Sequence, residues 1–130
     1  MTSVRLPPGL EESFRRLLGR LVKLTGKNFG EVNVALAREP KMRQLNRSWR
    51  HHDRVTDVLS FAYNSRPPAG DIIICLAQAA RQASRHGHSL KGELQLLFTH
   101  GCLHLAGYDH VKLKERQVMR SMERQLLQPN

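Results

Sequence analysis

The run Asp71–Leu76 (DIIICL) limits the fold most, because five apolar residues follow one aspartate without a polar interruption. A short apolar run without alternation is typical of a strand in the interior of a sheet. Two further strands are predicted at Glu31–Ala37, where apolar and polar residues alternate, and at Val58–Tyr63. The sequence therefore predicts a sheet that contains DIIICL as an interior strand.

Apolar residues at helical spacing occupy most of the rest of the chain. They predict helices at Pro8–Thr25, Lys41–Arg50, Ala77–Arg85, Ser89–Ala106 and Lys112–Leu127. The resulting order of elements is α-β-α-β-β-α-α-α. With a length of 130 residues, this order predicts one α+β domain over residues 1–130.

The charge balance favours a polyanionic partner. The chain carries 21 Lys and Arg against 11 Asp and Glu, a net charge of +10, and six of the basic residues lie between Arg38 and Arg54. A nucleic acid would bind such a surface, although a solvated basic surface without a partner is the alternative. With one Trp, two Tyr and four Phe, stacking on exposed rings is not expected to be the main mode of binding.

The expected compartment is the cytoplasm. No apolar run approaches the roughly 20 residues that span a bilayer, and the N-terminal segment lacks the apolar core of a secretory signal. The two cysteines, Cys75 and Cys102, lie in apolar segments and are expected to be buried and unpaired.

Three histidines are spaced for metal binding. On a helix, His100 and His104 lie about 40° apart in azimuth and about 6 Å apart in rise, so both imidazoles can reach one ion. Gly107 lets the chain leave the helix in a conformation unfavourable for most residues, and His110 can then fold back as a third ligand. Three ligands with an open fourth position are typical of a catalytic zinc site. Cys102 would point away from this pair.

The other four histidines show no such spacing. His86 and His88 flank a helix-ending glycine and are expected to be exposed to solvent. His51 and His52 lie in a basic loop, where a contact with phosphate is an open alternative.

The spacing of the three histidines is also that of the metzincin proteases, with one departure. Their first histidine is followed by Glu, the general base that deprotonates the zinc-bound water, whereas this chain has Gly101 there. A peptidase mechanism would therefore lack its base. Met119 and Met122 lie on the apolar face of a predicted helix and are expected to pack in the core.

Four blocks of the sequence match the motifs of one protein family. The block THGCLHLAGYDH (99–110), which contains the three histidines, closely resembles the signature H-G-x-L-H-L-x-G-Y-D-H of the YbeY family of rRNA-maturation endoribonucleases. LNRSWRHHDRVTDVLSFAY (45–63) resembles the block L-N-x-x-Y-R-x-x-D-x-x-T-D-V-L-S-F, with Trp49 where Tyr or Phe is common. GDIIIC resembles the family's G-D-I strand, and MRSMERQLL, with Met122 and Glu123, resembles its closing helix. The resemblance covers residues 45–127.

The resemblance implies a zinc-dependent endoribonuclease that is specific for single strands. Members process rRNA, notably the 3′ end of the small-subunit rRNA, and act in ribosome quality control; the implied partners are single-stranded RNA, rRNA and the small ribosomal subunit, with no membrane. The family's zinc ligands map onto His100, His104 and His110, one Zn²⁺ per chain, and its functional arginine maps onto Arg50. The implied fold is a small zincin-like α+β domain with a mixed four-stranded sheet and about five helices. The fourth strand is expected at Ser3–Pro7.

In the mechanism that follows, zinc activates a water molecule while the planar guanidinium of Arg50 binds the charge that grows on the phosphate. The general base stays open. Zinc hydroxide can act alone, or Asp109 can orient the water or a histidine, unless it only stabilises the turn. Asp57 and Asp71, at strand starts, could support the metal ligands or be structural. Water and the RNA 2′-hydroxyl both remain candidate nucleophiles.

Two rival functions remain. One is a metal-dependent hydrolase of a substrate other than RNA, including a degenerate protease; Gly101 and the charge of +10 count against it. The other is a non-catalytic, ribosome-associated factor in which zinc only stiffens the fold. An exchangeable ligand at the metal would count against that.

Overall fold

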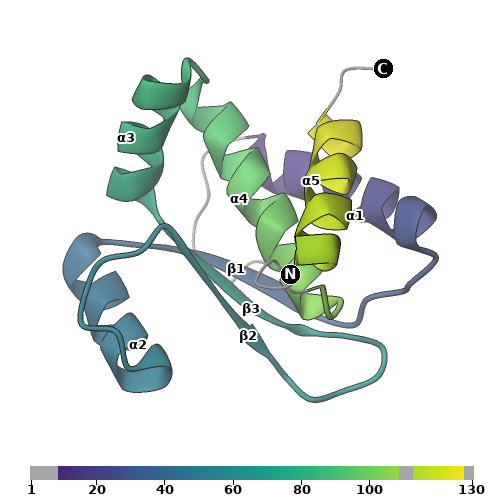
Figure 1. Ribbon diagram of the computed structural model, residues 1–130, viewed down its shortest axis with the longest axis horizontal. Helices are drawn as coiled ribbons and strands as arrows, with labels where there is room; N and C mark the ends of the chain where they lie inside the picture. The colour runs from purple at the N-terminus through teal and green to yellow at the C-terminus, as the bar shows by residue number, and fades with distance from the viewer. Residues whose placement is uncertain (1–8, 109–112, 128–130) are drawn as a thin grey trace.

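The computed structural model describes residues 9–108 and 113–127, which form five helices and three strands (Figure 1). The helices are α1 (Leu10–Thr25), α2 (Glu39–Arg50), α3 (Leu76–His86), α4 (Leu90–Leu105) and α5 (Leu113–Leu127). The strands are β1 (Val32–Ala37), β2 (Val58–Ala62) and β3 (Gly70–Cys75). The predicted α+β class and order of elements are confirmed. The expected fourth strand at Ser3–Pro7 lies outside the described residues.

The strand predicted to lie inside the sheet does so. Among the described residues the strand order is β1-β3-β2, with β1 parallel and β2 antiparallel to β3, so the sheet is mixed. Ile72 and Ile74 of β3 are fully buried. Because β3 has a neighbour on each side and helices over both faces, it needs apolar side chains in both directions.

The two faces of the sheet are covered by different helices. Ile72 and Ile74 pack into the main core with residues of α1, α4 and α5, whereas Ile73 and Cys75 lie in a smaller core with Met42 of α2. Figure 1 shows α2 on one side of the sheet and α1, α4 and α5 on the other. Successive side chains of a strand therefore point alternately into the two layers.

Helix α4 is central to the larger layer. The Phe98 ring stacks on Phe14 of α1, with ring centroids 4.2 Å apart. The Ser89 hydroxyl accepts a hydrogen bond from the Gly92 amide at 3.0 Å and caps the start of α4. Beyond its end, Gly107 has a φ of 98°, the conformation predicted for the point where the chain leaves the helix. The helix thus has defined limits at both ends.

The cysteines and methionines behave as core residues. Cys75 and Cys102 are both buried and unpaired, and burial raises the pKa of the Cys102 thiol well above its usual range. Met119 is buried, and Met122 packs against the main core. Both predictions are confirmed. No helix among the described residues is long and apolar enough to cross a membrane.

Candidate active site

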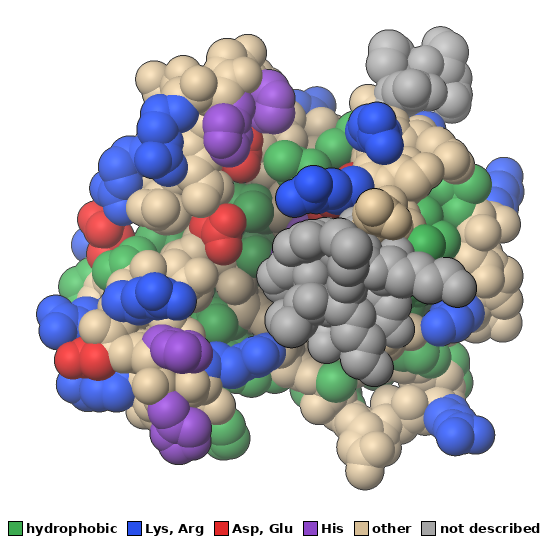
Figure 2. Space-filling model, viewed as in Figure 1, with side chains coloured by type: hydrophobic (Ala, Val, Ile, Leu, Met, Phe, Trp, Pro, Cys, Tyr) green, Lys and Arg blue, Asp and Glu red, His purple; other side chains and the backbone are tan. Residues whose placement is uncertain are grey.

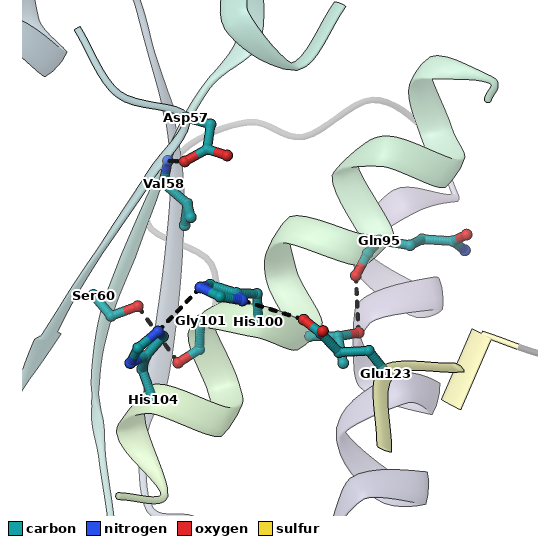
Figure 3. A network of polar contacts seen from close by, with 9 residues as sticks. Asp57, Val58, Ser60, Gln95, His100, Gly101, His104 and Glu123 are labelled. Atoms are coloured by element: carbon teal, nitrogen blue, oxygen red, sulfur yellow. Dashed lines mark hydrogen bonds and ion pairs between the residues drawn. The ribbon is translucent and has the colours of Figure 1, made fainter. Parts of the chain in front are cut away.

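His100 and His104 lie on one face of α4 with their rings converging (Figure 3). The Nε2 atoms are 3.0 Å apart, and the ring centroids are 4.6 Å apart at an interplanar angle of 66°. Both residues are partly exposed. Two nitrogens thus lie next to each other at a point that solvent can reach. His110 and Asp109 lie outside the described residues.

The spacing of these nitrogens suits a small dication. Zinc holds imidazole nitrogens at 2.0–2.1 Å, so two ligands of a tetrahedral site lie about 3.3 Å apart. The observed separation of 3.0 Å is close to that value. The donor set therefore fits a zinc ion at these two side chains.

Glu123 of α5 contacts the other ring nitrogen of His100. Its Oε2 lies 3.2 Å from Nδ1 of His100, and the Glu123 side chain is only 13% exposed. When Nδ1–H donates to a carboxylate, Nε2 of a neutral imidazole is left with its lone pair, which is the form that binds a metal. Glu123 is absent from the predicted site residues. The available signal was its place in the motif of the closing helix.

Gly101, between the two histidines, is required by packing. A Cβ at this position would lie 2.9 Å from Cγ2 of Ile72 and 3.1 Å from Oγ of Ser60. The close approach of α4 to the sheet therefore leaves no free space for a side chain, and the glutamate of a metzincin could occupy this position only if Ile72, Ser60 or the helix shifted.

Arg50, the last residue of α2, reaches the strand beside the histidines. Its Nη2 donates a hydrogen bond to the carbonyl oxygen of Ser60 at 2.6 Å, and its guanidinium lies 5.9 Å from the centre of the Phe61 ring. The Ser60 hydroxyl in turn donates to the carbonyl oxygen of Gly101 at 3.4 Å. A chain of contacts thus connects Arg50, through β2, with the turn of α4 that carries the two histidines.

Trp49 is the most exposed large apolar side chain among the described residues, at 67%. Its ring meets Phe61 edge-on, with centroids 6.1 Å apart. A large flat ring is therefore presented to solvent directly beside Arg50. Trp49 itself was not among the predicted site residues.

The basic segment from Arg38 to Arg54 forms an exposed surface over α2 and the loop that follows it. Figure 2 shows several Lys and Arg side chains where Figure 1 places α2. Arg43 binds Asp53 through two hydrogen bonds of 2.8 and 3.2 Å, which hold the pKa of the Asp53 carboxyl below its usual range. Arg47, Arg50 and Arg54 are exposed nearby, so the surface stays strongly positive.

The two other predicted carboxylates differ in position. Asp57 accepts hydrogen bonds from the Val58 amide and from Gln82, and it lines a cavity of about 300 Å³ together with His100 and Glu123. Asp71 points to the opposite face of the sheet, the same face as Ile73. Its carboxylate accepts hydrogen bonds from the Asn33 side chain and from the Tyr63 hydroxyl. The structure therefore brings Asp57 near the histidines and does not bring Asp71 there.

A second group of possible metal ligands lies at the junction of α3 and α4. One nitrogen each from His86 and His88 and one carboxylate oxygen of Glu93 lie within 4.8 Å of one another. Both histidines are exposed, as predicted, and they meet Glu93 although their spacing does not indicate a metal site. Their positions, 86, 88 and 93, span two helices and a turn, so no single periodicity indicates that they meet.

Sequence comparisons with known proteins agree on one family. A family model described as endoribonuclease YbeY matches residues 5–130. A relative named endoribonuclease YbeY from Heliobacterium modesticaldum is 38% identical over 141 residues, which cover 92% of this chain and 85% of the relative. Another of that name, from Pseudomonas putida, is 42% identical over 103 residues, covering 75% and 66%. The solution structure of TM1509 from Thermotoga maritima aligns with a TM-score of 0.69 at 30% identity, covering 98% of this chain and 87% of that one.

Proposed function

The chain belongs to the YbeY family of endoribonucleases, and from this premise we propose that it is a zinc-dependent, single-strand-specific endoribonuclease. Its proposed substrate is rRNA, at the 3′ end of the small-subunit rRNA, and its proposed setting is ribosome maturation and quality control in the cytoplasm, in contact with the small ribosomal subunit. The observation that carries the proposal is the convergence of two imidazole nitrogens, 3.0 Å apart, on one face of α4.

Under this proposal His100 and His104, together with His110, hold one Zn²⁺. When bound, zinc supplies a Lewis acid that lowers the pKa of a coordinated water to about 7 and offsets negative charge on a phosphoryl oxygen. Glu123 keeps His100 in the orientation and tautomer that ligation needs, since it accepts from Nδ1. It is a positioning residue, because it acts through the histidine.

Arg50 would bind the phosphate that is cleaved. Cleavage concentrates negative charge on the phosphoryl oxygens, and a guanidinium offers two parallel N–H donors to two of them. The bond to the Ser60 carbonyl and the Phe61 ring hold the Arg50 side chain against β2, on the same strand residue that contacts Gly101. The charge of Arg50 is thereby preorganised on β2, the strand that contacts the turn of α4 carrying the two histidines, before RNA arrives.

Selectivity for single strands has a physical basis in Trp49. Unpaired bases can turn out of their stack and lie on an exposed aromatic ring, whereas the bases of a duplex cannot. The Trp49 ring is exposed next to the residue that would hold the phosphate. A nucleotide with its phosphate at Arg50 could place a neighbouring base on this ring.

The test is cleavage by the purified chain of a single-stranded RNA, a matched duplex and casein, each with and without chelator. His104→Ala protein prepared in parallel controls for contaminating nucleases. We expect cleavage of the single strand alone, lost with chelator and absent from the variant. Equal cleavage by both preparations, or hydrolysis of casein in place of RNA, would overturn the proposal. Small-subunit particles with unprocessed rRNA then test the natural site.

A further inference from the structure

The junction of α3 and α4 carries a cluster of ligand-type side chains that the proposed active site does not use. His86 is the last residue of α3, His88 lies in the turn, and Glu93 lies in the first turn of α4. We propose that these three side chains form a second metal site, for a divalent transition-metal ion of the zinc type, distinct from the site at His100 and His104.

The distances within the cluster match a shared ion. Oε1 of Glu93 lies 3.1 Å from Nδ1 of His88 and 3.5 Å from Nδ1 of His86. Ligands of a tetrahedral zinc site are separated by about 3.3 Å, given zinc–ligand distances of about 2.0–2.2 Å. Both carboxylate–imidazole separations therefore match those of a shared ion, and all three ligand atoms lie within 4.8 Å of one another. Two imidazoles and one carboxylate form a set of ligands that favours zinc over calcium or magnesium.

The backbone of the turn holds these residues in place. Gly87 ends α3 with a φ of 71°, and the His88 amide donates to the carbonyl oxygen of Ala83 at 2.9 Å. On the other side, the Glu93 amide donates to the Ser89 carbonyl oxygen at 3.0 Å. The turn is thus fixed by hydrogen bonds that do not involve the three side chains. A metal ion would therefore have little of the backbone left to order.

The charge of Glu93 also favours a cation. Glu93 is only 1% exposed, whereas the His86 and His88 side chains are 51% and 46% exposed. Within the described part of the chain, the ion pairs of Glu93 are with these two histidines and with no Lys or Arg. Neutral imidazoles leave a buried carboxylate without a compensating charge, and a bound dication would supply it. The alternative is that protonated histidines supply it.

The second site is separate from the first. Glu93 precedes His100 by seven residues of α4, about two turns or about 10 Å of helix rise, whereas metal ions that act together on one phosphate lie about 3.5–4 Å apart. His86 and Glu93 line the same 300 Å³ cavity as His100. The second ion would therefore fasten the α3–α4 junction at the far end of that cavity and would not join the reaction at His100.

The experiment counts zinc bound per chain after equilibration with excess zinc and removal of unbound metal. The variants are His86→Ala/His88→Ala, His104→Ala, their combination, and a control that removes two other exposed histidines, His51→Asn/His52→Ala. Asparagine is chosen at position 51 because His51 has a φ of 60°, which asparagine tolerates. We expect two zinc ions in the unmodified chain and in the control, one in each of the first two variants, and none in the combination.

The outcomes separate the two sites. If His86→Ala/His88→Ala binds as much zinc as the unmodified chain, the second site is wrong. If that variant binds one zinc ion fewer and the control does not, the second site is supported, whatever amount of zinc the His104→Ala variant binds. A second measurement leaves the three residues of the junction unsubstituted: the imidazole ¹⁵N spectrum of the His104→Ala protein. One equivalent of zinc should shift the His86 and His88 signals and leave those of His51 and His52 in place. Unchanged His86 and His88 signals would overturn the proposal.

Discussion

The Glu123 carboxylate on α5 lies 3.2 Å from Nδ1 of His100 on α4, so the two helices meet at a contact between a carboxylate and a predicted metal ligand. Replacing Glu123 with Ala should weaken zinc binding at that site by about 10- to 100-fold, since the imidazole loses its orienting partner. Glu123→Gln, which keeps an acceptor oxygen, should restore part of the affinity. Competition with a colorimetric chelator measures this. Equal affinity in all three proteins would show that the contact has no part in metal binding.

Arg50 should affect cleavage and not metal content. Arg50→Ala and Arg50→Glu should lower the cleavage rate by about 10²-fold or more with zinc fully bound, because a positioned donor to a developing charge is worth about that much. Arg50→Lys should recover little, since an ammonium lacks the planar pair of donors. Arg54→Ala, an exposed arginine of the same segment, is the matched control and should change the rate only slightly. Loss of zinc in the Arg50 variants would make the role of Arg50 structural.

Trp49 can be tested by its own fluorescence, since it is the only tryptophan in the chain. Single-stranded RNA should quench its emission and matched duplex should not. Trp49→Ala should weaken single-strand binding by about 1–3 kcal/mol, the range for stacking of one base, and Trp49→Phe by less. A Trp49→Ala protein with unchanged affinity for single strands would remove Trp49 from the RNA-binding surface.

Two glycines should respond in opposite directions to a methyl group. Gly101→Ala should lower the free energy of unfolding by about 1–3 kcal/mol, because its Cβ would lie 2.9 Å from Ile72. Gly19→Ala, in the exposed middle of α1 with nothing within 4 Å, should raise it by about 0.5–1 kcal/mol. Urea unfolding of both variants measures the difference. A Gly101→Ala protein as stable as the unmodified chain would contradict the close packing of α4 on the sheet.

Asp71 should act on Tyr63 and not on the metal. Its hydrogen bond to the Tyr63 hydroxyl raises the pKa of that phenol, because the bond is lost when the phenol ionises. A raised pKa in the folded state favours folding at lower pH, and this contribution is lost as the pH rises through the folded-state value. Asp71→Asn should therefore lower the Tyr63 pKa, measured by tyrosinate absorbance, and leave zinc content unchanged. Zinc loss in Asp71→Asn would place Asp71 at the site after all.

The elements of the fold could be predicted because they depend on local periodicity. The apolar run of β3, the stripe on α1 and the Gly107 stop each act within a few residues, and the structure follows them closely. The contact between Glu123 and His100 could not be predicted in this way, because it depends on how α5 packs against α4. Arg50 was indicated only by a motif, and its bond to the Ser60 carbonyl depends on the packing of α2 against the sheet.

The cluster at His86, His88 and Glu93 shows the same limit at shorter range. The three residues lie within eight positions of one another, yet they meet only because Gly87 reverses the chain between α3 and α4. A helical pattern predicts contacts three or four residues apart and carries no information across such a turn.

The most direct test of the zinc-dependent mechanism is the cleavage rate of single-stranded RNA as zinc is added back to metal-free His86→Ala/His88→Ala protein, with the bound metal counted in the same samples. The rate should rise in proportion to the first equivalent of zinc bound and then stay constant. The same protein carrying His104→Ala should bind no zinc and should not cleave. Full cleavage before zinc is added, or cleavage by the His104→Ala protein, would contradict the proposed mechanism.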